Sequence, residues 1–321
     1  MFKNESSFVS KLKEQMLKEF LCHDRKGVYA YTQKSMAYNS NKIEGSTLTS
    51  EQTASLFDTG SIVGEDDKIY RAKDIEEMTG HFKMFNEVLK NLGAPLNIEM
   101  IKSFHFQLKS GVFEDYANGY PIGEFKKYKN QVSDIETELP QNIPHKIGEL
   151  VDQYNKSDKT LEDIVKFHAA YEKIHPFQDG NGRTGRAIIL KQCFDANIVP
   201  VIVSDNEKLL YYQALHMAQT EHQYGKLLEF FKKEQEKYYE NVKDFVIPFK
   251  EKEQASSFFS EPKEEDLAEL ASPKQETEKF TMVAGSSLKD IENRAGLSDA
   301  PEQQEEIEHD EQTSEEYEFV D

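Results

Sequence analysis

Apolar side chains recur every three or four positions along most of the first 250 residues, which is the period of an amphipathic helix. The pattern predicts helices over Val9–Phe20, Met78–Leu92, Leu161–Ile174, Ala187–Phe194 and Leu209–Phe231. The last of these stretches is long enough for one helix or two. The body of the chain is therefore expected to be all-α.

Two segments depart from this pattern. Ala117–Val132 has turn residues followed by aromatic and aliphatic residues at loose alternation, which predicts a short β-hairpin or an extended arm. Pro140 and Pro144 are expected to bracket a loop ahead of a further helix at Ile147–Tyr154. The expected fold class is thus a helical bundle with one short hairpin.

The composition changes near residue 250, where apolar residues give way to Glu, Ser, Gln and Pro. Residues 251–321 hold 22 of the 59 acidic residues and 6 of the 39 basic ones, so their net charge is −16 and that of residues 1–250 is −4. So little apolar surface cannot offset the entropy of ordering the chain. We expect 251–321 to be a disordered acidic tail, in which Leu267–Leu270 and Leu288–Ile291 are candidate short helices for a partner.

Charge and cysteine content exclude several classes of protein. No basic stripe suited to nucleic acid is evident, and no apolar run is long enough to span a membrane. Cys22 and Cys193 are too few for a disulfide framework and fit a reducing compartment. No signal peptide is evident at the start, so we expect a cytoplasmic protein, with export by another route as the alternative.

The stretch from His175 to Arg186 reads His-Pro-Phe-Gln-Asp-Gly-Asn-Gly-Arg-Thr-Gly-Arg and is the richest in chemistry. Gly180–Gly185 matches the dinucleotide-binding pattern G-x-G-x-x-G, but that pattern follows a strand, and Leu161–Ile174 has helical period. The P-loop pattern also fails, because no Lys-Ser/Thr pair follows the glycines. Neither interpretation explains the histidine, the acid and the arginines.

A helix that starts near Gly182 would use every one of these residues. The unpaired N–H groups of its first turn bind anions, and Arg183 and Arg186 lie three apart on one face, where they can hold phosphate oxygens. Asp179 is a hard oxygen ligand suited to Mg²⁺, and His175 can accept a proton near neutral pH. This arrangement predicts a site that binds and cleaves a polyphosphate.

These twelve residues resemble the signature of the Fic family, His-Pro-Phe-x-Asp/Glu-Gly-Asn-Gly-Arg-x-x-Arg, and match it at every position. The resemblance covers about residues 30–240 and implies the Fic fold, a helical bundle around a central loop-helix active-site motif. It implies an N-terminal helical region at 1–95 and a Fic core at 96–245.

The resemblance also implies an activity. Fic enzymes usually transfer AMP from ATP to a Ser, Thr or Tyr hydroxyl of a target protein and release pyrophosphate. By resemblance, His175 would deprotonate the hydroxyl and Asp179 would hold Mg²⁺ against the α- and β-phosphates. Asn181 and the backbone of Gly180 and Gly182 would form an anion hole. The implied phosphate-binding set is Gly180, Asn181, Gly182, Arg183, Gly185 and Arg186.

Two further groups of residues follow from the resemblance. Tyr211, Tyr212 and Gln219 fall where the family places its adenine pocket; the family usually has Asn at the last position, so Gln219 is a departure that bears on base preference. Gly123–Val132 resembles the flap, a hairpin that pairs with the extended backbone of the target.

Within the flap, Gly123, Phe125 and Lys126 are the expected docking residues. The side chains of Lys126, Lys127 and Lys129 are expected to be solvated.

A second match lies upstream, where Ser40-Asn-Lys-Ile-Glu44-Gly45 resembles the inhibitory motif of the family, Ser/Thr-x-x-x-Glu-Gly/Asn. Ser40 and Glu44 share a face of the expected helix at about 34–45, and Gly45 is a natural stop. By resemblance, Glu44 would pair with Arg186 and hold it away from the γ-phosphate.

Alternatives stay open at this point. Some relatives use the same glutamate to remove AMP, and a non-catalytic binding module is a further alternative. The expected partner is a target protein of unknown identity, with self-modification and a homodimer also open.

Overall fold

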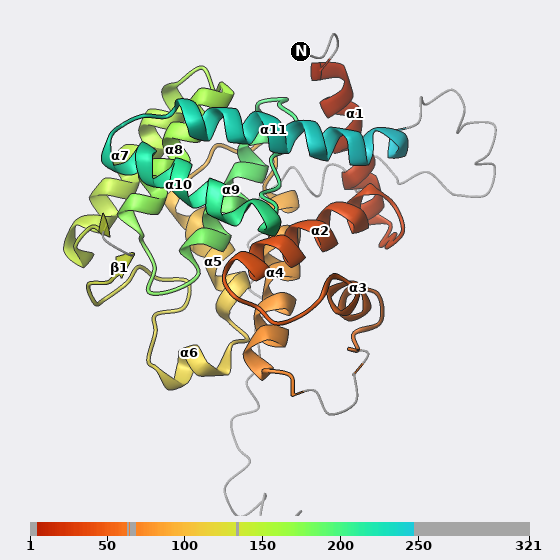
Figure 1. Ribbon diagram of the computed structural model, residues 1–321, viewed down its shortest axis with the longest axis horizontal. Helices are drawn as coiled ribbons and strands as arrows, with labels where there is room; N and C mark the ends of the chain where they lie inside the picture. The colour runs from red at the N-terminus through yellow and green to blue at the C-terminus, as the bar shows by residue number, and fades with distance from the viewer. Residues whose placement is uncertain (1–4, 63, 65–68, 133–134, 247–321) are drawn as a thin grey trace, which may run out of the picture. The chain divides into compact units, whose positions relative to one another are not determined.

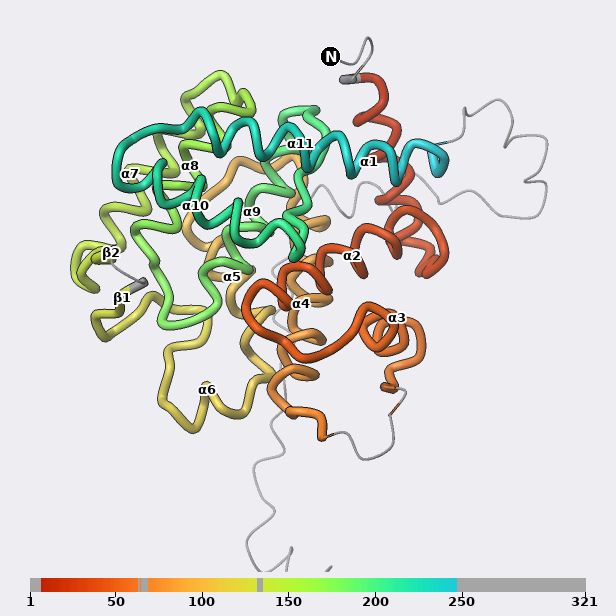
Figure 2. The backbone as a smooth tube through the Cα atoms, in the orientation of Figure 1, coloured from red at the N-terminus to blue at the C-terminus, as the bar shows by residue number. Residues whose placement is uncertain are grey.

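The computed structural model describes residues 5–62, 64, 69–132 and 135–246, and within them it is almost wholly helical (Figures 1 and 2). The predicted acidic tail, with Leu267–Leu270 and Leu288–Ile291, lies outside the described residues. The helices are α1 (Glu5–Leu21), α2 (Val28–Ile43), α3 (Ser50–Thr59), α4 (Ala72–Lys90), α5 (Ile98–Lys109), α6 (Phe113–Ala117), α7 (Ile143–Lys156), α8 (Leu161–Ile174), α9 (Asn181–Asp195), α10 (Lys208–Thr220) and α11 (Gly225–Val242).

The all-α prediction is confirmed, and α1, α4, α8 and α9 lie where the apolar period placed them. The stretch Leu209–Phe231 is two helices, because the chain turns between α10 and α11. Helix α7 begins earlier than predicted, so Pro144 lies in its first turn and not in a loop. Proline is tolerated there because a first-turn N–H has no partner within the helix.

The hairpin is displaced from its predicted place. Strands β1 (Gln131–Val132) and β2 (Ile135–Glu136) pair antiparallel, with Gln131 opposite Glu136. The described residues 118–130 form no strand. Gly119 and Gly123 adopt positive φ values of 67° and 73°, which turn this segment repeatedly and prevent a continuous strand.

Helix α9 lies at the centre of the bundle and packs against α2, α4, α5 and α8 (Figure 2). Every residue from Arg183 to Phe194 is buried. Its apolar residues fill the space between the neighbouring helices. Burying each large aliphatic side chain stabilises the fold by about 1.5–3 kcal/mol. A helix buried on all sides holds its N-terminus firmly, and the predicted active-site motif sits at that end.

Helices α4 and α5 approach each other closely at Gly80. A Cβ atom at this position would lie 1.9 Å from the carbonyl oxygen of Leu108, so only glycine fits. The backbone contact brings Glu77 of α4 and Lys109 of α5 within ion-pair distance. Two ionic side chains are thereby placed behind the motif.

One hydrophobic cluster runs through the helices on both sides of residue 95. It includes Val9, Met36 and Phe85 as well as Phe177 and Val242. The main core of the described residues therefore continues across the predicted division between a region 1–95 and a core 96–245, and a small second cluster of Ala37, Leu48 and Met78 lies within the first region. The division stays a prediction. No helix in this part of the chain has the length and apolar character that crossing a bilayer requires.

Candidate active site

The motif occupies the loop between α8 and α9, and both ends of that loop have left-handed backbone. His175 ends α8 with φ 53°, and Gly180 precedes α9 with φ 80°. The loop is held in shape from within: Asn181 Oδ1 accepts the Phe177 N–H at 2.8 Å, and Asn181 Nδ2 donates to the Phe177 carbonyl at 2.9 Å. Both polar atoms of the Asn181 side chain therefore hold the loop together. The group of Asn181 that can bind an anion is its backbone N–H.

His175 lies at the start of this loop with its protonation pattern set by the backbone. Its Nδ1 lies 3.3 Å from the Glu172 carbonyl oxygen, which can only accept, so Nδ1 carries the hydrogen and Nε2 keeps its lone pair. Burial lowers the pKa of His175 to about 4. The imidazole is thus neutral at pH 7, and the lone pair on Nε2 can accept a proton.

The two arginines of the motif are buried and bound to residues far away in the sequence. Arg183 Nη1 lies 2.6 Å from Glu77 Oε2 and donates to Asn41 Oδ1 at 3.2 Å. Arg183 Nη2 lies 3.5 Å from Asp179 Oδ2. Burial alone would lower the pKa of Arg183, but Glu77 and Asp179 outweigh it and raise that pKa.

Arg186 is held by the end of α2. Its Nη2 lies 2.7 Å from Glu44 Oε1 and 3.1 Å from the Ser40 carbonyl oxygen, and its Nε donates to Ser40 Oγ at 2.9 Å. The structure thus brings the two sequence-predicted motifs into direct contact. A Cβ atom on Gly182 would lie 2.5 Å from Glu44 Oε1. The carboxylate of Glu44 therefore sits over the first turn of α9, where a helix N-terminus binds anions.

The position of Glu44 is fixed by the chain that follows it. Gly45 has φ 91° and ends α2 as predicted. Asp74 at the start of α4 accepts the backbone N–H of Thr47 at 2.8 Å, and Arg71 donates to the Gly45 carbonyl at 2.8 Å. These contacts attach the end of α2 to α4. The position of Glu44 is therefore fixed by the backbone as well as by its ion pair with Arg186.

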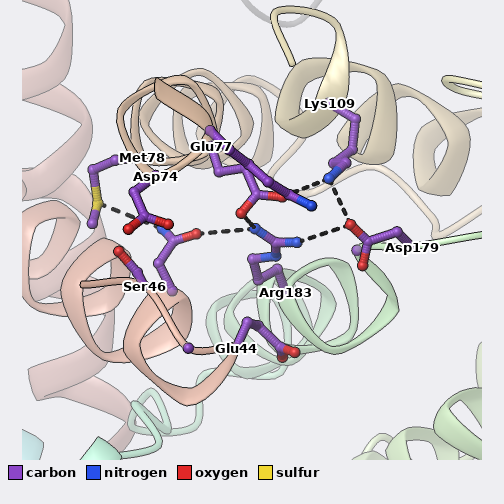
Figure 3. Close-up of polar contacts among 12 residues, drawn as sticks. Glu44, Ser46, Asp74, Glu77, Met78, Lys109, Asp179 and Arg183 are labelled. Carbon is purple, nitrogen blue, oxygen red and sulfur yellow. Dashed lines mark hydrogen bonds and ion pairs between the residues drawn. The ribbon is translucent and has the colours of Figure 1, made fainter. Parts of the chain in front are cut away.

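Asp179 belongs to a network of buried charges behind the loop, in which Glu77, Lys109, Asp179 and Arg183 turn toward one another (Figure 3). Lys109 Nζ lies 2.7 Å from Asp179 Oδ2. Burial alone would raise the pKa of Asp179, but Arg183 and Lys109 hold it well below its usual range. Asp179 is consequently ionised at neutral pH.

The residues around Asp179 fit a magnesium ion that takes most of its ligands from phosphate and water. Its side chain is 40% exposed, so the carboxylate can be reached from solvent. Among the described residues no three His, Cys, Asp or Glu side chains gather to hold a metal. Magnesium is commonly held by one or two carboxylates together with substrate phosphates.

The predicted flap is tied to the loop by His105, which the sequence did not single out. The Gly123 N–H donates to His105 Nδ1 at 3.0 Å, so the hydrogen lies on Nε2, which donates to the Asp179 carbonyl at 3.0 Å. The imidazole also stacks on Phe177, with ring centroids 3.9 Å apart. Burial lowers the pKa of His105 to about 3, so this bridge is neutral at pH 7.

The prediction that Lys126 is solvated was wrong. Its side chain is buried, and Nζ donates to Asn130 Oδ1 at 2.6 Å and to Thr137 Oγ1 at 2.8 Å. Burial lowers its pKa to about 8. The backbone N–H of Lys126 donates to the Pro176 carbonyl at 2.9 Å, which holds this residue against the active-site loop. Lys127 and Lys129 are exposed as expected.

Phe125 is half-buried against Phe177, and Lys102 Nζ lies 5.1 Å from its ring centre.

The predicted adenine-pocket residues lie on α10, beside α8. Tyr211 is buried, with its hydroxyl 2.6 Å from His168 Nε2. Tyr212 is 39% exposed, and Lys208 lies over its ring. Gln219 is buried and donates to the Ala169 carbonyl at 3.4 Å.

Gly185 faces α8, where a Cβ atom would lie 2.3 Å from Glu172 Oε1.

Sequence reasoning missed four residues that shape the site: Asn41, Glu77, His105 and Lys109. Asn41 stands at a variable position of the inhibitory motif, and Lys109 looks like the ordinary basic residue at a helix C-terminus. Only the packing of α2, α4 and α5 around α9 reveals their roles.

A histidine in its base form and an ionised acid at a buried helix N-terminus with two arginines define a site for polyphosphate chemistry. Residues 95–193 match the model of the Fic/DOC family. The chain therefore carries a Fic domain.

Solved structures share this fold. A Fic domain-containing signaling protein from Bacteroides thetaiotaomicron superposes with a TM-score of 0.60 at 22% identity, over 81% of this chain and 100% of that one. Fic-1 from Caenorhabditis elegans gives 0.54 at 18% identity, over 76% of this chain and 71% of that one.

Curated relatives carry the name of an enzyme. The protein adenylyltransferase fic-1 of Caenorhabditis briggsae is 25% identical over 65% of this chain and 43% of its own length. The protein adenylyltransferase Fic of Nematostella vectensis is 25% identical over 56% of this chain and 42% of its own length. The chain spans less than half the length of these two relatives.

Proposed function

We propose that this chain is a protein adenylyltransferase that transfers AMP from ATP to a Ser, Thr or Tyr hydroxyl of a target protein. The observation that carries the proposal is the gathering of His175, Asp179, Arg183 and Arg186 around the N-terminus of α9. The names of the curated relatives support the same reaction.

In the proposed reaction His175 is the general base. The target hydroxyl oxygen forms a bond to the α-phosphorus, the bond from that phosphorus to the oxygen bridging the β-phosphate breaks, and pyrophosphate leaves. The hydroxyl proton passes to His175 Nε2, which holds a lone pair because Nδ1 faces the Glu172 carbonyl.

The remaining groups bind and orient the triphosphate. The first-turn N–H groups of α9 face the phosphates, while Arg183 and Arg186 compensate their charge. Asp179 would hold Mg²⁺, which neutralises phosphate charge when bound. Tyr211, Tyr212 and Gln219 remain our proposal for the adenine pocket, and the segment from Gly123 for docking of the target.

We further propose that Glu44 restrains the enzyme. Its carboxylate occupies the anion site over Gly182 and takes up Arg186, which is the arginine proposed to grip the γ-phosphate. A γ-phosphate entering there would meet a fixed negative charge in place of a free guanidinium. ATP would then bind with its α-phosphate out of line.

Labelled ATP tests both parts of the proposal. Glu44→Gly protein incubated with Mg²⁺ and ATP labelled on the α-phosphate should acquire covalent label, on itself or on an added protein extract. His175→Ala in the same background should lose it by a factor of about 10²–10⁴, the usual contribution of a general base. Label that binds but never becomes covalent would favour a binding module, and release of AMP from labelled protein by wild type would favour the reverse reaction.

A further inference from the structure

Lys109 is a buried ammonium group surrounded by three carboxylates. Its side chain is 1% exposed, and Nζ lies 2.6 Å from Glu77 Oε1, 2.7 Å from Asp115 Oδ2 and 2.7 Å from Asp179 Oδ2. Lys109 is therefore a fixed positive charge behind the active-site loop.

This charge belongs to a closed ring with the motif. Glu77 bridges Lys109 and Arg183 with one oxygen to each, and Asp179 Oδ2 faces the same two cations (Figure 3). Two cations thus share one oxygen of the carboxylate that would hold the metal. Arg183 is also one of the two arginines proposed to bind phosphate, so a shift of charge at Lys109 reaches the nucleotide site through the carboxylates that the two cations share.

The ammonium cannot easily withdraw from this position. Lys109 ends α5, and the contact of Gly80 with the Leu108 carbonyl locks α5 against α4. Asp115 on α6 closes the far side of the lysine. Removing Lys109 would take its ion pair from the buried carboxylate of Asp115, which is costly.

Building on the proposed function, we propose that Lys109 is a resident cation that competes with the divalent metal for the charge of Asp179. Without metal, Lys109 screens Asp179 from the incoming phosphates, so nucleotide binds to some extent. With metal, the carboxylate charge of Asp179 is shared between the metal and the two cations already paired with it, so the metal adds less than it otherwise would. Lys109 thereby sets how strongly nucleotide binding depends on metal, and acts as a positioning residue.

The measured quantity is the metal enhancement, the ratio of nucleotide dissociation constants in EDTA and in saturating MgCl₂. The probe is α,β-methylene-ATP, which cannot be cleaved at the α–β bond, titrated by calorimetry into Glu44→Gly protein. Lys109→Met in this background should weaken binding in EDTA and raise the enhancement by at least about fivefold, the lower end of ordinary coupling factors. An enhancement equal to that of the parent, with binding in Mg²⁺ retained, would overturn the inference.

Two further variants separate charge from folding. Lys191 is the matched control, because its side chain is also 1% exposed and is paired with an aspartate, Asp195, within α9 and away from the loop. Lys191→Met should lower the melting temperature and leave the metal enhancement unchanged. Asp115→Asn keeps Lys109 but gives it one competitor fewer for Asp179, so the enhancement should fall. This variant decides the matter if Lys109→Met does not fold, because an unchanged or higher value would contradict the competition.

Nucleotide binding by the Glu44→Gly parent separates a failure of the proposed function from a failure of the role proposed for Lys109. If Glu44→Gly protein binds no nucleotide even in Mg²⁺, the proposed function fails and this inference falls with it. If the parent binds and its enhancement is insensitive to both Lys109→Met and Asp115→Asn, only the role of Lys109 is rejected.

Discussion

Removing the carboxylate of Glu44 is the sharpest perturbation that the structure offers. Arg186 makes three contacts with α2, and only the one to Glu44 Oε1, at 2.7 Å, is an ion pair. The other two, to Ser40, are with neutral oxygens and remain in a Glu44→Gly variant. The arginine should therefore stay in place while becoming available to a phosphate.

The size of the effect follows from that one contact. A hydrogen bond to a charged group contributes about 1.5–3 kcal/mol net, and each 1.4 kcal/mol is a factor of ten. The side chain of Glu44 is 32% exposed, so solvent screening places the value in the lower part of this range. We therefore expect Glu44→Gly to raise kcat/KM for AMP transfer by about 10- to 30-fold.

The assay follows incorporation of labelled AMP under single-turnover conditions, alongside calorimetry of nucleotide binding. Glu44→Gln keeps the shape and removes the charge, so it should reproduce most of the activation if charge is the cause. Glu99→Gln alters an acid on α5 whose side chain is 84% exposed and should change nothing. The reasoning is refuted if Glu44→Gly leaves both incorporation and nucleotide affinity at the wild-type values.

Three further outcomes follow from particular contacts. Ser40→Ala removes one hydrogen bond that Arg186 donates and leaves the ion pair with Glu44 in place, so the labelling assay should register less activation than the about 10- to 30-fold expected for Glu44→Gly; equal activation would contradict the ranking. Burial raises the pKa of Glu172 from 4.5 to about 8, so the stability associated with its neutral form is present below pH 4.5 and is lost as the pH rises toward and through 8. Urea unfolding at pH 5 and pH 8 should therefore show a smaller loss for Glu172→Gln than for wild type, and parallel losses would show that this carboxyl is not the cause. Gly80→Ala should lower the free energy of unfolding by about 1–3 kcal/mol, because the added carbon overlaps the Leu108 carbonyl. A melting temperature equal to that of wild type would mean that α4 and α5 can move apart without loss of stability.

Most of the helical body was predictable because its apolar residues follow one period, although α3, α5 and α6 were not predicted. The same signal failed where backbone freedom outweighed side-chain pattern. Gly119 and Gly123 turn the segment that was predicted to be a short hairpin or an extended arm, and Pro144 lies in a first helical turn and not in the predicted loop.

The sequence by itself determined the chemistry of the loop. A histidine, a carboxylate, glycines and arginines within twelve residues have few joint uses, and their spacing requires only local geometry at one helix start. The match of residues 95–193 to the Fic/DOC family agrees with that local argument.

The tertiary structure decided what surrounds this chemistry. Glu44 meets Arg186 across 142 positions of sequence, and Lys109 meets Asp179 across 70. Such pairs depend on how α2, α4 and α5 close around α9, and a single acid or lysine on a helix carries no mark of the partner it will find. Ionic interactions act through distance and burial, and only the folded packing fixes both.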